Sequence, residues 1–174
     1  SGKHLPSCYR RLRLFSSGIH RQMGIAENSP VAWSDLDVVF VDDVRPIFYD
    51  RYEPFVGWKG VGAFRDAVFN GTFVLFRAGR VDHLWEEFDP VRTPQLCNAA
   101  KYFGSDQAWL SYRMAEHSPG WGVADGVFSF SRDVLPLRSP RQPRGARVVS
   151  FNGKWKPWSR DVQARHPWIK DHWR

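Results

Sequence analysis

Two aspartates interrupt an apolar, β-branched stretch of this 174-residue chain. Val31–Ser34 and Val38–Val41 flank the tripeptide Asp35-Leu36-Asp37, and we expect one buried strand that the tripeptide interrupts. An unpaired carboxylate is costly to bury, and residues two apart on a strand face the same side. Like charges placed in this way repel each other unless a cation lies between them.

Divalent metal ions offer one explanation of this Asp-x-Asp pattern. Mg²⁺ and Mn²⁺ prefer oxygen ligands, few of them from protein and the rest from phosphate and water. The pattern therefore suits a cation that carries a diphosphate. The alternative is that both aspartates mark a strand end in solvent or cap a turn. Asp42-Asp43, shortly before Pro46, is a second acidic pair and indicates a solvated turn.

The rest of the chain alternates between strand-like and helix-like segments. The strand-like segments are Phe55–Trp58, Thr72–Phe76, Val127–Phe130 and Val148–Phe151, and the helix-like ones are Val81–Phe88 and Asp106–Glu116. Ser105 is the expected N-cap of the second helix. This alternation predicts an α/β fold with a mixed β-sheet flanked by helices.

Three more polar groups lie beside predicted strands or helix ends. In Ser150–Trp158, Gly153 allows a close approach of the backbone to a ligand, and its lysines can neutralise an anion. Asp106-Gln107 opens the second helix, and Asn70-Gly71 precedes a strand. Taken singly, each has an ordinary structural explanation: a basic turn, an N-terminal first turn and a loop.

Charge and cysteine content limit the class of protein. The net charge of +7 indicates an anionic partner, whether nucleic acid, anionic lipid or a phosphorylated small molecule. Much of it lies in Arg10–Arg13 and Arg138–Arg147. The chain has none of the common nucleic-acid-binding signatures, so a nucleic-acid partner is disfavoured and stays an alternative. Cys8 and Cys97 match no zinc or redox spacing, and free thiols indicate a cytoplasmic location.

Apolar runs are short throughout the sequence. The longest, such as Val38–Val41 and Phe73–Phe76, fall far below the ~20 residues that a membrane helix needs. We therefore expect no membrane span.

In their order along the chain, these groups resemble the motifs of GT-A-type glycosyltransferases, in particular the family of glycogenin and the bacterial lipopolysaccharide galactosyltransferases. The four matching pieces are Ser34–Val41 followed by Val44–Phe48, Phe69–Phe76, Asp106–Trp109 and Ser150–Trp158. The resemblance spans roughly Val31 to Trp158, and the last piece is the most specific.

The resemblance implies a metal-dependent transfer of a hexose from a nucleoside-diphosphate sugar to a hydroxyl group of a glycan or other acceptor. Asp37 would bind Mn²⁺ or Mg²⁺, and Asp35 would contact the metal or the donor ribose. Gly153 and Lys156 would hold the diphosphate. Asn70 and the catalytic pair Asp106-Gln107 would face the donor sugar and the acceptor. The metal would act as a Lewis acid on the leaving diphosphate.

Two departures from the family pattern affect this prediction. The family begins its last motif with a metal-binding histidine, where this chain has Ser150. The family also places nucleotide-recognition strands before the Asp-x-Asp, so we expect a single partial GT-A-like domain over residues 1–174 with these strands truncated. Its motif-bearing body covers 30–158 and its aromatic tail 159–174. The alternative function is a non-catalytic transferase remnant or a carbohydrate-binding protein.

Overall fold

The computed structural model describes residues 7–48, 51–59 and 68–173. The chain forms two compact units, each built from two separate segments. The first unit contains Ser1–Ala32 and Tyr52–Gly120, and the second contains Trp33–Arg51 and Trp121–Arg174. The single domain over residues 1–174 stays a prediction.

A four-stranded sheet runs through the first unit in the order β1-β4-β3-β5. Its strands are β1 (Pro30–Ser34), β3 (Phe55–Trp58), β4 (Asn70–Arg77) and β5 (Gly120–Trp121). The inner strands β3 and β4 pair antiparallel, with Phe55 opposite Phe76, and are almost entirely buried. The edge strands β1 and β5 are those in which the chain passes from one unit to the other.

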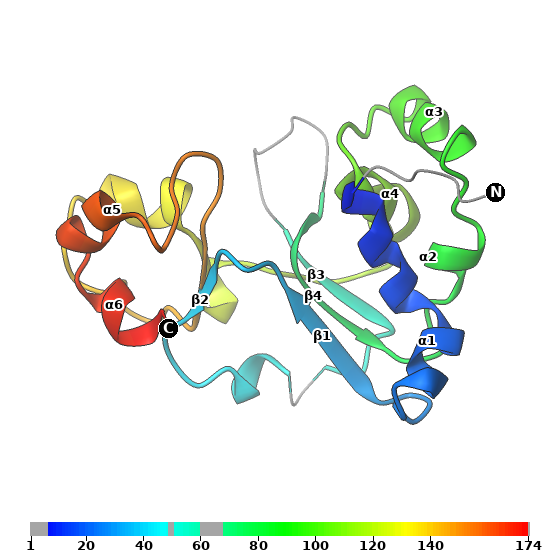
Figure 1. Ribbon diagram of the computed structural model, residues 1–174, viewed down its shortest axis with the longest axis horizontal. Coiled ribbons are helices and arrows are strands. Elements are labelled where there is room, and N and C mark those ends of the chain that lie inside the picture. Colours follow the sequence, from blue (N-terminus) through cyan, green and yellow to red (C-terminus); the bar gives the residue numbers. More distant parts are fainter. Residues whose placement is uncertain (1–6, 49–50, 60–67, 174) are drawn as a thin grey trace. The chain divides into compact units, whose positions relative to one another are not determined.

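Helices gather on one side of this sheet in Figure 1. They are the 3₁₀ helix η1 (Ser7–Phe15) and the α-helices α1 (Ser17–Gln22), α2 (His83–Glu86), α3 (Arg92–Ala99) and α4 (Asp106–Met114). Aromatic side chains join them to the sheet: Phe15 contacts Phe76 edge-on at 4.8 Å between ring centroids. Trp109 on α4 donates a hydrogen bond to the carbonyl of Leu84 on α2 at 2.8 Å.

The second unit contains a three-stranded mixed sheet in the order β2-β7-β6. Its strands are β2 (Val38–Phe40), β6 (Val127–Ser129) and β7 (Val148–Ser150), with β2 antiparallel and β6 parallel to β7. The helical segments of this unit are η2 (Arg45–Ile47), η3 (Val123–Asp125), the π-helix η4 (Phe130–Val134), η5 (Leu135–Leu137), α5 (Arg160–Arg165) and α6 (Trp168–His172). A core cluster joins the sheet to the last two helices and includes Val149, Phe151 and Ile169.

Most predicted elements are present, and the α/β class with mixed sheet and flanking helices is confirmed. The helix predicted at Asp106–Glu116 ends at Met114, and that predicted at Val81–Phe88 shortens to His83–Glu86. Ser105 occupies the N-cap position of α4 but makes no side-chain cap hydrogen bond. Helices η1, α1 and α3 were not predicted from the sequence.

The single strand predicted around the two aspartates is wrong. Residues 30–34 and 38–40 are separate strands of different sheets, and Leu36 between them is 86% exposed at a turn. The first of these strands is also only partly buried. Asp35 and Asp37 therefore lie in the turn that connects β1 to β2, where carboxylates keep access to solvent.

No helix in the described part of the chain is long and apolar enough to span a bilayer.

Candidate functional site

Sheet pairing in the second unit brings the first and last motifs together. The antiparallel register of β2 and β7 places Val38 opposite Ser150, and the amide of Phe151 donates to the carbonyl of Asp37 at 2.8 Å. Lys156, six residues past the end of β7, donates from Nζ to Asp37 Oδ2 at 2.5 Å. Asp37 and Lys156 are 119 residues apart in sequence. Their side chains are 16% and 31% exposed, so this ion pair remains open to solvent on one side.

The two other predicted residues of this unit differ in their surroundings. Gly153 is exposed, has φ +60°, and would place a Cβ in open space. A glycine suits that left-handed backbone and leaves room for a ligand. Ser150 is fully buried, and its hydroxyl has no hydrogen-bond partner in the part of the chain that the structure describes. A buried hydroxyl without a partner costs free energy, which makes Ser150 an unsatisfied polar group beside the motif residues.

The oxygen ligands that the second unit offers suit only some cations. Among the described residues no group of three or more His, Cys, Asp or Glu side chains is placed to hold a metal ion. Asp35, Asp37 and the Ser150 hydroxyl offer oxygen atoms alone. Mg²⁺ is commonly bound by one or two carboxylates together with substrate phosphates. These residues therefore fit a cation that arrives with a diphosphate better than one bound by the protein alone.

In the first unit, Asp106 is the most enclosed of the predicted site residues. Its carboxylate is fully buried at the start of α4, where it forms an ion pair with Arg11 Nε. It also accepts a hydrogen bond from the Ser105 hydroxyl at 2.7 Å. The Arg11 side chain is 27% exposed, so the guanidinium connects the buried carboxylate with the surface.

Asn70 and Gly71, predicted to precede a strand, are instead the first residues of β4, and Gly71 packs against this ion pair. A Cβ at Gly71 would lie 2.9 Å from Asp106 Oδ2 and 3.1 Å from Arg11 Nη2, so only glycine leaves both side chains in place. Asn70 Oδ1 accepts hydrogen bonds from the amide and the hydroxyl of Thr72. Gln107 is half-buried and lies over Gly104 instead of Asp106. Gly71 and Asp106 are thus brought together, whereas the side chain of Asn70 binds Thr72 and that of Gln107 contacts Gly104.

Arg11 is a candidate functional residue that the sequence reasoning missed. It belonged to a run of arginines noted only for its charge. The apolar residues Tyr9, Leu12 and Phe15 recur every three positions, and this spacing is the signal that could have found it. All three are buried, as expected of one face of a 3₁₀ helix. Arg11 lies on another face, which turns it toward α4.

The remaining charged and titratable groups have simpler explanations. Arg138, Arg141 and Arg144 are exposed in the loop between η5 and β7, where water solvates their charges. Cys8 and Cys97 are both free thiols. Burial raises the pKa of the Cys97 thiol to about 11, which makes it a poor nucleophile at neutral pH.

Comparisons with known proteins agree on the fold. No protein-family model matches the chain, and no curated protein sequence does. Among solved structures, the galactosyltransferase LgtC in complex with donor and acceptor sugar analogues aligns with TM-score 0.57 and 16% identity, over 95% of this chain and 67% of that chain. The glycosyltransferase GlyE of Streptococcus pneumoniae TIGR4 aligns with TM-score 0.57 and 13% identity, over 98% and 46%.

A further match is an active-site mutant of LgtC, with TM-score 0.57, 16% identity and coverage of 97% and 71%. This chain thus spans about half the length of GlyE and about two thirds that of LgtC. At these identities the likeness establishes the fold, and the resemblance noted in the sequence is confirmed at that level. The chain has a GT-A-like glycosyltransferase fold.

Proposed function

We propose that this chain takes part in glycosyl transfer from a nucleoside-diphosphate sugar to a hydroxyl acceptor, with Mg²⁺ or Mn²⁺. The observation that carries the proposal is the pairing of Asp37 with Lys156 in the second unit. A carboxylate and an ammonium held together beside an exposed glycine offer one group for a cation and one for phosphate oxygens.

In the second unit we assign the cation to Asp35 and Asp37, and the diphosphate to Gly153 and Lys156. The cation would supply Lewis-acid stabilisation of the leaving diphosphate. The Lys156 ammonium adds to this by neutralising charge that grows on the phosphate oxygens as the sugar departs. The turn at Gly153 lets the diphosphate approach the main chain, because no side chain fills that space.

In the first unit we assign sugar recognition to Asn70, Asp106 and Gln107. Because the Asp106 carboxylate is fully buried and bound by Arg11 and Ser105, it would act by holding the 27% exposed Arg11 side chain in place for the hydroxyls of the sugar. Gly71 packs directly against this carboxylate, so any larger residue there would displace Asp106 or Arg11.

The central experiment is a calorimetric titration with pyrophosphate and then UDP, each with Mg²⁺ or Mn²⁺. Pyrophosphate tests the diphosphate site without any contribution from base recognition. We expect saturable, metal-dependent binding that Asp37→Asn abolishes and Lys156→Met weakens at least about tenfold, as for the loss of a charge-assisted contact. Lys154→Gln is the matched control, because Lys154 lies over the Trp155 ring at 5.0 Å in the same turn. Absence of pyrophosphate binding in the unmodified protein would refute a working donor site.

The same titration separates the role of the Asp37 carboxylate from that of the Lys156 ammonium. In the ligand-free protein the Lys156 ammonium occupies Asp37, so it competes with any divalent cation for that carboxylate. Lys156→Met should therefore bind Mn²⁺ alone more tightly than the unmodified protein while it binds pyrophosphate less tightly. Equal Mn²⁺ affinity in both proteins would contradict a shared carboxylate.

Transfer itself is tested by hydrolysis or transfer of the sugar from UDP-hexoses. We expect Asp106→Asn to lose this activity while it keeps pyrophosphate binding. If the unmodified protein binds UDP-sugar but never breaks the glycosidic bond, the non-catalytic carbohydrate-binding alternative is correct. Ser150, in place of the histidine of the family motif, is the observation that favours this second candidate.

A further inference from the structure

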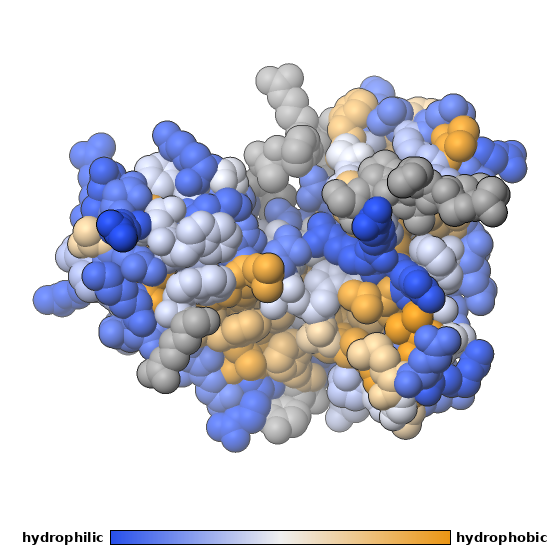
Figure 2. All heavy atoms as spheres, viewed as in Figure 1, coloured by the Kyte–Doolittle hydropathy of each residue, from blue (hydrophilic) through white to orange (hydrophobic). Residues whose placement is uncertain are grey.

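The 3₁₀ helix η1 sorts its side chains onto three faces. In a 3₁₀ helix residues three apart lie above one another. Tyr9, Leu12 and Phe15 form the buried face. Arg11 is directed to Asp106. Arg10 and Arg13 share the third face, where both are exposed and where hydrophilic atoms follow η1 in Figure 2.

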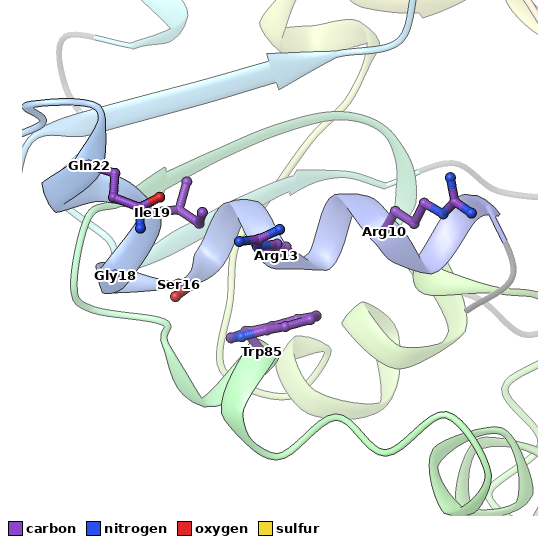
Figure 3. A pocket seen from close by; sticks show the side chains of 7 residues that line it. All are labelled: Arg10, Arg13, Ser16, Gly18, Ile19, Gln22 and Trp85. Carbon is purple, nitrogen blue, oxygen red and sulfur yellow. The ribbon is translucent and has the colours of Figure 1, made fainter. Parts of the chain in front are cut away.

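A cavity of about 540 Å³ in the first unit opens along this third face. It is lined by Arg10, Arg13 and Ser16 at successive three-residue steps, by Ile19 and Gln22 of α1, and by Trp85 of α2 (Figure 3). In that view Arg13 lies above the Trp85 ring, and Arg10 lies further along the same helix. The volume is in the range of pockets that hold small molecules.

The lining side chains have unused binding capacity. Within the described residues, neither the Arg10 nor the Arg13 guanidinium makes a hydrogen bond or an ion pair, and the half-buried Trp85 indole contacts no other ring. Arg113 of the same unit is, by contrast, paired with Glu87. Two unpaired guanidinium groups beside an open indole favour an anion that also has an apolar face.

We propose that this cavity binds an acidic saccharide unit, a pyranose that bears a carboxylate or a phosphate. The guanidinium groups of Arg10 and Arg13 bind the anion. The C–H face of the sugar lies against Trp85 and Ile19, and its hydroxyls are within the reach of Ser16 and Gln22. A nucleic acid is less well matched, because backbone tracking needs a longer row of cations than this pocket supplies. The site does not depend on the donor-site proposal, since none of its residues carries a role there.

The experiment titrates the protein with glucuronate, glucose 6-phosphate, glucose and inorganic phosphate by calorimetry at low salt. We expect both acidic sugars to bind. Glucose and phosphate should bind at least about tenfold more weakly, because glucose has no anionic group for the arginines and phosphate has no apolar face for Trp85. Arg10→Gln/Arg13→Gln should weaken both acidic sugars at least about tenfold. Arg92→Gln, an exposed charge on α3 of the same unit, is the matched control and should leave binding unchanged.

A second variant tests the role of the ring. Trp85→Leu should remove the preference for the sugar phosphate over inorganic phosphate, because the residual site recognises the anion alone. The three altered side chains are exposed or half-buried, and thermal unfolding of each variant checks that the fold is kept. The proposal is overturned if the double arginine variant binds acidic sugars like the unmodified protein, or if phosphate binds as tightly as glucose 6-phosphate. It is also overturned if a single-stranded oligonucleotide binds more tightly than either acidic sugar and loses affinity in the same variant.

Discussion

Each unit of this protein holds one motif aspartate against one basic side chain, and the two pairs differ in burial. In the first unit Asp106 is fully buried and its partner is Arg11. In the second unit Asp37 is 16% exposed and its partner is Lys156, itself 31% exposed. A buried carboxylate depends on its partner, because an uncompensated buried charge is costly. In a partly hydrated ion pair, the carboxylate or the ammonium can exchange its partner for a ligand at little cost in free energy. The first pair therefore fixes geometry, and the second is suited to binding.

The largest expected effect concerns the stability contributed by the two basic partners. Arg11→Met leaves Asp106 buried without a counter-charge and should lower the free energy of unfolding by about 3 kcal/mol or more. Lys156→Met leaves a hydrated carboxylate and should cost less than about 1 kcal/mol. Urea denaturation followed by circular dichroism measures both. Equal losses in the two variants would remove the distinction between a fixed pair and an exchangeable one.

A second contrast concerns two fully buried serines. Ser111 on α4 accepts a hydrogen bond from the amide of Phe69 at 2.9 Å, whereas the Ser150 hydroxyl on β7 has no partner within residues 7–48, 51–59 and 68–173. Ser111→Ala should destabilise the protein by about 2 kcal/mol, because it leaves a buried amide unsatisfied. Ser150→Ala should be neutral or stabilising by up to about 1 kcal/mol, because it removes an unsatisfied group.

The same urea curves test this contrast. A clear loss of stability in Ser150→Ala would mean that the hydroxyl has a partner in solution. If Ser150→Ala keeps its stability but binds the Mg²⁺–pyrophosphate pair more weakly, the hydroxyl is a ligand of the cation site.

The smallest expected effect is the response of the two units to acid. Burial is the main cause that lowers the pKa of both His83 and His166 below the ordinary value of 6.5. Each imidazole is then neutral in the folded protein, and the unfolded chain takes up protons first as pH falls. Their contribution to stability is therefore complete above pH 6.5 and decreases below it.

The histidines differ in their neighbours. At His83 the carboxylates of Glu87, Asp82 and Glu86 oppose the effect of burial on the pKa and Arg113 adds to it, whereas at His166 a hydrogen bond with the Ser139 backbone opposes it and Arg165 adds to it. His166→Phe and His83→Phe should each flatten the decline in unfolding free energy below about pH 6.5. Urea denaturation midpoints measured between about pH 6.5 and pH 5 test this prediction. If the midpoint of His166→Phe falls with pH as steeply as that of the unmodified protein, the prediction is wrong.

Much of the local structure could be predicted from the sequence. The strands at Phe55–Trp58 and Val148–Ser150 and the helix from Asp106 follow from periodicity and flanking residues. The order of the motifs also pointed to a GT-A-like fold, which the structural neighbours confirm. Periodicity failed at Asp35–Asp37, where two apolar runs looked like one strand. It cannot tell that the two runs pair with different sheets, because that choice depends on partners distant in sequence.

The sequence by itself determined many of the strands and helices, though not η1, α1 and α3, and it determined which residues carry charge and which motifs occur in which order. The tertiary structure alone decided the partners: Arg11 with Asp106 across 95 residues, and Lys156 with Asp37 across 119. It also decided that Ser150 is buried with no hydrogen-bond partner for its hydroxyl among the described residues, and that Arg10, Arg13 and Trp85 line one cavity. The physical reason is that local patterns fix which side of an element is apolar. The partner of a polar side chain depends on how all elements of a unit pack to bury their apolar faces together.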